Sequence, residues 1–144
     1  MDRLKGKVAI VTGAGAGIGK ALATRLARDG AAVVVADLSG TRAEAITSAI
    51  TKDGGRAAAI KMDASEPAAV QRTIQLALDT FGRLDVMMNN AGLAEPAPLE
   101  EISLESWNRV IAVTLTSAFL GMKYCLPIMR AQGNIMPSLS LEIL

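Results

Sequence analysis

The chain has 144 residues, which is long enough for one domain with a hydrophobic core. Hydrophobic residues make up 51% of it and charged residues 20%, a balance that excludes an intrinsically disordered chain. The net charge is +1, without a clustered basic run or repeated aromatic residues, so the composition favours neither nucleic acid nor an anionic membrane surface as a partner.

Four short apolar runs alternate with longer segments of helical periodicity. The runs are nearly continuous in apolar residues, which is typical of strands buried on both faces; they cover residues 8–11, 33–36, 57–62 and 84–88. The three helical segments between them are followed by glycines, and the third is predicted to begin at Ser65, with Pro67 near its first turn. This alternation predicts an α/β fold, a Rossmann-type doubly wound parallel sheet in three αβα layers.

A longer helix is predicted from about Ser103, its N-cap, to about Arg130. Its apolar residues lie on nearly every side, which is typical of a helix covered from two directions. We expect the sheet to cover one side and a second subunit the other, as in a homo-oligomer. The apolar stretch at 110–122 is interrupted by threonine and serine and is shorter than the roughly 18 residues of a spanning helix, so no membrane segment is predicted.

The chain has one cysteine, Cys125, and no histidine. A single cysteine excludes an internal disulfide and indicates a reducing compartment, and without a histidine base Cys125 is predicted to be a core residue rather than a nucleophile. The apolar run at 8–11 is too short for the core of a signal peptide, which needs roughly 7–15 residues. We therefore expect a cytoplasmic protein, and no metal site is predicted.

A glycine-rich turn follows the first predicted strand, with Thr12, Gly13, Gly17 and Gly19 in the spacing Thr-Gly-x-x-x-Gly-x-Gly. Bare backbone there permits a tight turn, close approach of a phosphate, and a helix N-terminus whose dipole attracts that phosphate. A nucleotide-triphosphatase loop does not fit, because that pattern needs a glycine where Ala14 stands and a serine or threonine where Ala21 stands. The strict Gly-x-Gly-x-x-Gly spacing does not fit either, and a turn that binds nothing remains an alternative.

With further motifs in order along the chain, residues 4–132 resemble the short-chain dehydrogenase/reductase family. These are Asp37 after the second strand, Asp63 after the third, Asn89-Asn90-Ala91-Gly92 after the fourth, and residues 110–116 in the long helix. The resemblance implies an NAD(P)-dependent oxidoreductase that transfers hydride between nicotinamide and an alcohol or carbonyl substrate. It also implies a dinucleotide site formed by Thr12, Gly13, Gly17, Ile18, Gly19, Asp37, Asp63, Ala64, Asn90, Ala91 and Gly92.

Asp37 indicates which dinucleotide is preferred. A carboxylate at the end of the second strand accepts the two ribose hydroxyls of NAD and repels the 2′-phosphate of NADP, and no lysine or arginine lies in the turn from Thr12 to Gly19. NAD is therefore predicted over NADP. The alternatives are that Asp37 is an ordinary strand-end acid, that Asp63 only caps the next helix, and that Asn89-Asn90 is only a turn.

The catalytic groups implied by the resemblance are missing or altered. Thr114 stands where the family has asparagine, no Tyr-x-x-x-Lys occurs, and Ser140 falls only near the serine position, in a segment where Pro137 interrupts the predicted fifth strand. We expect an incomplete cofactor-binding domain over residues 1–132 and an out-of-pattern tail over 133–144, as in a truncated product. Two functions stay open: an oxidoreductase, or a catalytically inactive fragment that binds NAD or pairs with subunits. The sequence does not indicate a substrate.

Overall fold

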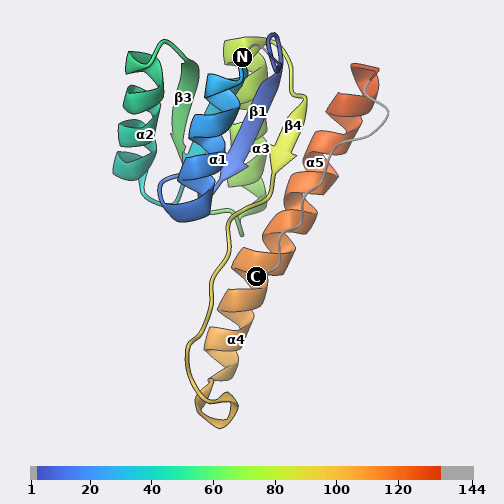
Figure 1. Ribbon diagram of the computed structural model, residues 1–144. Helices are drawn as coiled ribbons and strands as arrows, with labels where there is room; N and C mark the ends of the chain where they lie inside the picture. Colours follow the sequence, from blue (N-terminus) through green and yellow to red (C-terminus); the bar gives the residue numbers. More distant parts are fainter. Residues whose placement is uncertain (1–2, 134–144) are drawn as a thin grey trace.

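The computed structural model describes residues 3–133, which form a four-stranded parallel sheet with helices on both faces (Figure 1). The strands are β1 (Val8–Thr12), β2 (Ala32–Asp37), β3 (Arg56–Lys61) and β4 (Val86–Met88), in the order β3-β2-β1-β4. The predicted α/β class and all four predicted strands are confirmed, with bounds that differ by no more than two residues. The expected fifth strand and tail lie outside the described residues.

Helices α1 (Gly17–Arg28) and α2 (Gly40–Lys52) cover one face of the sheet, and α3 (Pro67–Phe81) and α5 (Ser117–Ala131) cover the other. In β2, Val33 and Val35 pack beneath α1 and α2, whereas Val34 and Ala36 pack against the layer that contains α3. Alternate side chains of a strand point to opposite faces, so a strand covered on both faces must be apolar throughout. The continuous apolar runs of the sequence follow directly from this arrangement.

The start of α3 differs from the prediction by two residues. Glu66 is its N-cap and Pro67 its first residue, while Ser65 stays outside the helix. The Ser65 hydroxyl and N–H both donate to Asp63 Oδ1, at 2.6 and 3.0 Å, which holds Ser65 in the turn before the helix. The helix ends as predicted at Gly82, which has φ of 81° in the left-handed region that glycine favours.

The long helix runs without a break through α4 (Leu104–Ile111), a π-helical segment (Ala112–Thr116) and α5. A short 3₁₀ turn (Leu99–Glu101) precedes it, and Ser103 caps it by accepting the Ser106 N–H at 3.0 Å, as predicted. Of the parts of this long helix, α5 packs on the sheet, whereas α4 extends beyond the sheet (Figure 1). Within residues 3–133, Leu104–Ala131 is the one helix whose length and composition would suit a membrane span, a property that core helices of soluble proteins share.

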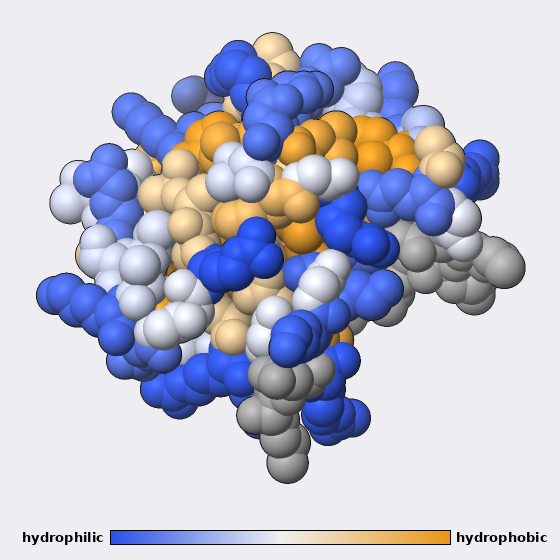
Figure 2. Space-filling model, turned by 90° about the horizontal axis from the view of Figure 1, so that it is seen from above, coloured by the Kyte–Doolittle hydropathy of each residue, from blue (hydrophilic) through white to orange (hydrophobic). Residues whose placement is uncertain are grey.

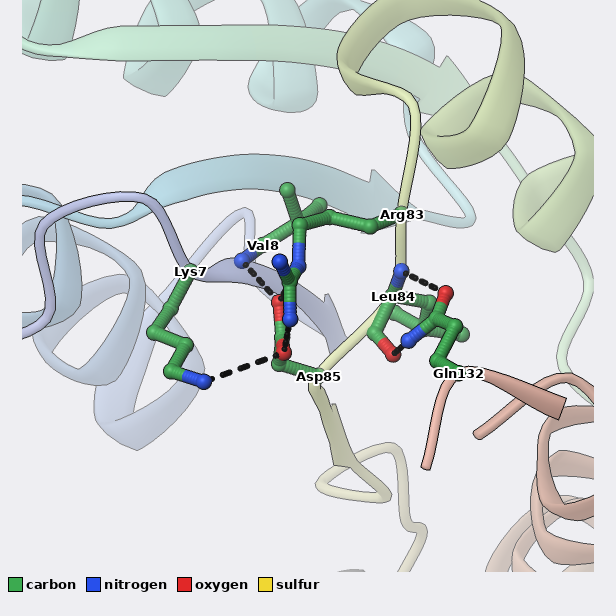
Figure 3. A network of polar contacts seen from close by, with 6 residues as sticks. All are labelled: Lys7, Val8, Arg83, Leu84, Asp85 and Gln132. Carbon is green, nitrogen blue, oxygen red and sulfur yellow. Dashed lines mark hydrogen bonds and ion pairs between the residues drawn. The ribbon is translucent and has the colours of Figure 1, made fainter. Parts of the chain in front are cut away.

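Polar groups join the start of β1 and the residues just before β4 to Gln132, the C-cap of α5 (Figure 3). The buried Asp85 carboxylate accepts the Val8 N–H at 3.0 Å and is held by Arg83 at 2.6 Å, while Lys7 lies 3.4 Å away. The Gln132 amide accepts the Leu84 N–H at 2.9 Å and donates to the Leu84 carbonyl at 2.7 Å. Because Leu84 pairs with a side chain rather than with a strand, β4 begins at Val86 instead of residue 84.

The strands begin at the end of the molecule viewed in Figure 2, where hydrophobic side chains occupy the middle of the surface and hydrophilic ones the rim. Their carboxyl ends meet at the opposite end of the sheet, beside the start of α1 and the loop that leads to α4 (Figure 1). In parallel sheets this is the edge at which ligands bind. The residues predicted to bind the dinucleotide all lie at strand ends, at the start of α1 or in the loops that follow the strands there.

Candidate functional site at the carboxyl ends of the strands

The glycines of the first turn are required by its geometry. Gly13 and Gly17 have φ of 63° and 52°, in the region that residues with a Cβ rarely adopt. A Cβ on Gly19 would lie 2.5 Å from Asn90 Nδ2 and closer still to the Gly13 carbonyl oxygen. Glycine at these positions therefore allows α1 to start directly against the turn that leaves β1.

Thr12 and Asn90 lock the turn after β1 to the loop after β4. Thr12 Oγ1 accepts the N–H groups of Asn90 at 3.0 Å and Ala91 at 2.9 Å and donates to the Met88 carbonyl. The Asn90 amide donates back to the Thr12 carbonyl at 3.0 Å. Asn90 thus does more than form a turn, since its side chain fixes the spacing between two strand ends.

Asn89 faces the opposite direction, toward α5. A Cβ on Gly121 would clash with the Asn89 amide and lie 3.0 Å from Met87 Cε, so glycine at 121 brings α5 close to the end of β4. Asn89 Nδ2 is buried and finds no hydrogen-bond partner among residues 3–133. The Gly121 contact could not be predicted from the sequence, because it depends on the distance between a helix and a strand.

Asp37 is buried at the carboxyl end of β2, as predicted. Burial alone would raise its pKa, but hydrogen bonds from the Ser39 and Gly15 N–H groups and the charge of Arg42 outweigh burial and hold the pKa below its ordinary value. Gly15 belongs to this arrangement, since a Cβ there would lie 2.7 Å from Asp37 Cγ and from Arg42 Cβ. Neither Gly15 nor Arg42 was predicted as a site residue.

Asp63 lies two residues beyond β3 and is held mainly by Ser65. The Ser65 hydroxyl is the largest of the effects that keep the pKa of Asp63 below its ordinary value, and Arg109 of α4 adds its charge from 3.4 Å. Asp63 is therefore not a simple cap of α3, whose N-cap is Glu66. The Asp63–Arg109 ion pair links the β3 loop to the long helix.

A cavity of about 260 Å³ opens between these loops. Seven predicted residues line it: Gly13, Asp37, Asp63, Ala64, Asn90, Ala91 and Gly92. Thr12 and Gly19 are buried behind its wall, and Gly17 and Ile18 are exposed at the start of α1. The sequence did not indicate the other lining residues, which are Ala16, Leu38, Arg42, Met62, Leu93, Arg109 and Val113.

The N-terminus of α1 has no side-chain cap among the described residues and no acidic residue in its first turn. Ser39 caps α2 and Ser103 caps α4, whereas α3 also lacks a side-chain cap but begins with Pro67, which has no N–H to offer. The first N–H groups of a helix have no partner within it, and together with the helix dipole they attract an anion. The uncapped end of α1 is thus suited to a phosphate.

No group of residues that could hold a metal ion occurs in the described part of the chain.

A family model described as short chain dehydrogenase matches residues 7–141. The chain belongs to this family. It is 42% identical over 134 residues to a cyclohexanol dehydrogenase of Acinetobacter sp. and 40% identical over 133 residues to a 2,5-dichloro-2,5-cyclohexadiene-1,4-diol dehydrogenase of Sphingobium indicum. Each match covers 92% of this chain and 53% of the relative. The chain thus spans about half the length of these curated relatives.

A solved structure of a Serratia marcescens short-chain dehydrogenase/reductase, a double mutant, superimposes with a TM-score of 0.82 at 41% identity. The match covers 88% of this chain and 52% of that one. The Rossmann-type fold expected from the sequence is confirmed by this likeness and by the sheet order. Dehydrogenases of this family use nicotinamide dinucleotides.

Thr114, at the position where the short-chain dehydrogenase family has asparagine, lies inside the π-helical segment. Its hydroxyl accepts the Leu93 N–H at 3.0 Å and donates to the Leu93 carbonyl at 3.3 Å, so Leu93 engages the hydroxyl hydrogen and one lone pair. Cys125 is fully buried, and burial raises its pKa to about 11, which agrees with its prediction as a core residue. Ser140 and Pro137 lie outside the described residues.

Proposed function

We propose that this chain is the dinucleotide-binding part of an oxidoreductase that transfers hydride between a nicotinamide and an alcohol or carbonyl substrate, with NAD preferred over NADP. The observation that carries the proposal is the uncapped N-terminus of α1, held against the β1 turn by Gly19 and flanked by the Asp37 carboxylate. Membership of the short chain dehydrogenase family and the dehydrogenase names of the relatives support the reaction class.

In this proposal each part of the site has one task. The N–H groups at the start of α1 bind the pyrophosphate, Asp37 accepts a ribose hydroxyl, and Asp63 and Ala64 lie beside the adenine. Asn90 keeps the two strand ends at a fixed distance, through its bond to the Thr12 carbonyl. The nicotinamide, when bound, supplies the carbon that accepts or donates hydride.

Titration of the 144-residue chain with NADH and NADPH, followed by nicotinamide fluorescence, tests the proposal. We expect NADH to bind more tightly, and Asp37→Ala to narrow the difference, because that change removes the charge that repels a 2′-phosphate. Asp53→Ala is the matched control, since it removes one carboxylate at the exposed end of α2, away from the cavity. Equal binding of both ligands by the unchanged chain would contradict the preference, and binding of neither would contradict the function.

A second candidate is a chain that binds NAD or pairs with subunits and catalyses nothing. Two observations at the family's catalytic positions favour it. The Thr114 hydroxyl is hydrogen-bonded to the Leu93 backbone, and the 144 residues contain no Tyr-x-x-x-Lys. A tyrosine acid–base needs a neighbouring cation to lower its pKa from about 10. Turnover and binding therefore have to be measured separately in this chain.

A further inference from the structure

We propose that Arg109 is a positioning residue of the dinucleotide site, which couples ligand binding to the placement of α4 against the cavity. The inference rests on the proposed function, because it concerns how the same cavity is closed. It is carried by the ion pair between Arg109 and Asp63, two residues that both line the cavity and whose nearest atoms lie 3.4 Å apart.

The helix α4 is attached to the rest of the described chain by polar side chains. None of its eight residues is buried, and it extends beyond the sheet on which α5 packs (Figure 1). Ser106 donates to the Glu95 carboxylate in the loop after β4, and Arg109 donates to Asp63 after β3. A segment with few buried contacts moves easily, so these two contacts determine where α4 lies against the cavity.

The two carboxylate oxygens of Asp63 have different partners. Oδ1 accepts the Ser65 hydroxyl and N–H, which orients the carboxylate from within its own turn. Oδ2 is approached by Arg109 Nη1 at 3.4 Å and accepts no other hydrogen bond from residues 3–133. A carboxylate offers about four lone-pair positions, so Oδ2 can also accept an N–H group of a ligand beside Arg109. The amino group of adenine is a donor of this kind.

The ion pair is long enough to tighten when a ligand binds. Charge-assisted N–H···O bonds measure about 2.7–2.9 Å, roughly half an ångström less than the distance found here. The side chains of Arg109 and Asp63 are 47% and 29% exposed, so water weakens their attraction. A ligand that fills the cavity displaces this water and strengthens the attraction between the two charges. Because α4 has no buried side chain, it can follow, and binding is expected to draw it onto the cavity.

A movement of α4 changes more than one part of the cavity wall. Arg109 and Val113 lie one turn apart on the long helix, and both line the cavity, one with a charge and the other with an apolar side chain. The Ser65 hydroxyl is the largest of the effects that lower the pKa of Asp63, and Arg109 supplies the charge among these effects. Arg109 therefore acts on the ligand through Asp63 and through the position of its own helix.

The first test measures NADH binding by nicotinamide fluorescence in variants of the 144-residue chain. Arg109→Gln is expected to raise the Kd for NADH about fivefold, the upper end for an exposed ion pair. Arg109→Lys keeps the charge and should recover most of this loss. Arg25→Gln is the matched control, since it breaks a pair between an exposed arginine and Asp29, both outside the cavity, and should leave the Kd unchanged.

Two further measurements separate positioning from a general loss of structure. Reduced nicotinamide hypoxanthine dinucleotide has a carbonyl oxygen in place of the adenine amino group, so its Kd should exceed that of NADH in the unchanged chain and lie closer to it in Arg109→Gln. Because coupling is reciprocal, saturating NADH should slow hydrogen exchange of the α4 amides about fivefold in the unchanged chain and in Arg25→Gln. In Arg109→Gln the exchange of α4 should not respond to NADH.

Three results would overturn the inference and leave the proposed function standing. These are an unchanged Kd for NADH in Arg109→Gln, a weaker Kd with the same preference between the two dinucleotides, and NADH binding by the unchanged chain without slower exchange in α4. If Arg109→Gln does not fold, Asp63→Asn breaks the same pair from the other side, and slowing of α4 exchange by NADH in that variant would overturn the inference. Binding of neither dinucleotide by the unchanged chain overturns the proposed function and this inference together.

Discussion

Replacing Gly19 with alanine tests whether α1 must lie directly against the β1 turn. The new Cβ would lie 2.5 Å from Asn90 Nδ2 and 2.8 Å from the Gly13 carbonyl carbon, where ordinary contacts begin at 3.4 Å. The helix and the turn therefore have to separate by about 1 Å, since the Gly13 backbone cannot rotate away as a side chain can. The Asn90 bond to the Thr12 carbonyl, now 3.0 Å, would be lost or lengthened.

The expected cost follows from these contacts. Overpacking costs about 1–3 kcal/mol and a lost hydrogen bond about 0.5–1.5 kcal/mol, while alanine in place of glycine in a helix returns at most about 1 kcal/mol. The net loss in the free energy of unfolding should be about 0.5–4.5 kcal/mol. Dinucleotide affinity should fall as well, because the N–H groups at the start of α1 move away from the turn.

Urea denaturation followed by far-ultraviolet circular dichroism measures this loss as a lower midpoint with an unchanged slope. Gly40→Ala is the matched control, since Gly40 also begins a helix and its Cβ would lie 3.4 Å from Lys61 Cβ, an ordinary contact. Gly40→Ala should leave stability unchanged or raise it by up to about 1 kcal/mol. Equal stability of the two variants would refute the close packing of α1 on the β1 turn.

Two other outcomes are expected for the 144-residue chain. It should show no substrate-dependent NADH formation with simple alcohols, since general acid–base catalysis contributes about 10²–10⁴-fold and no Tyr-x-x-x-Lys is present; turnover by protein free of host enzymes would contradict this. It should associate at micromolar concentration, because Leu104, Trp107, Leu115 and Phe119 are each more than half exposed on one helix, and a Trp107→Ser/Phe119→Ser variant should associate less. A 15.0 kDa monomer in light scattering of the unchanged chain would contradict the second expectation.

The elements of the fold could be predicted because their signals are local. Strands covered on both faces have to be apolar throughout, and Ser103, the predicted cap of α4, acts within three residues of its own position. The β-strand ends also identified half of the residues that line the cavity, since side chains that follow parallel strands meet at one edge. The predicted bounds of the strands differ slightly from the observed ones. At the start of β4, for example, Leu84 pairs with the Gln132 side chain and not with a neighbouring strand.

The contacts that reach the site from residues far away in the sequence could not be predicted in the same way. Arg109 reaches Asp63 across 46 residues, and the π-helical segment around Thr114 has no distinct periodicity in the sequence. Arg42 is different, because it stands five residues after Asp37 and three after a serine cap. A strand-end carboxylate, a capping serine and an arginine in the first turn of the helix form a pattern that could have indicated the ion pair.

The site depends more on backbone and packing than on catalytic side chains, and this separates binding from turnover. The turn after β1 is shaped by glycines, α1 offers N–H groups, and Thr12 and Asn90 join two strand ends through bonds to the main chain. None of these features requires the groups that carry out hydride transfer. Loss of catalytic groups would therefore leave dinucleotide binding intact, whereas a change as small as one methyl group at Gly19 should impair it. Binding of a dinucleotide by the 144-residue chain is for this reason the first property to measure.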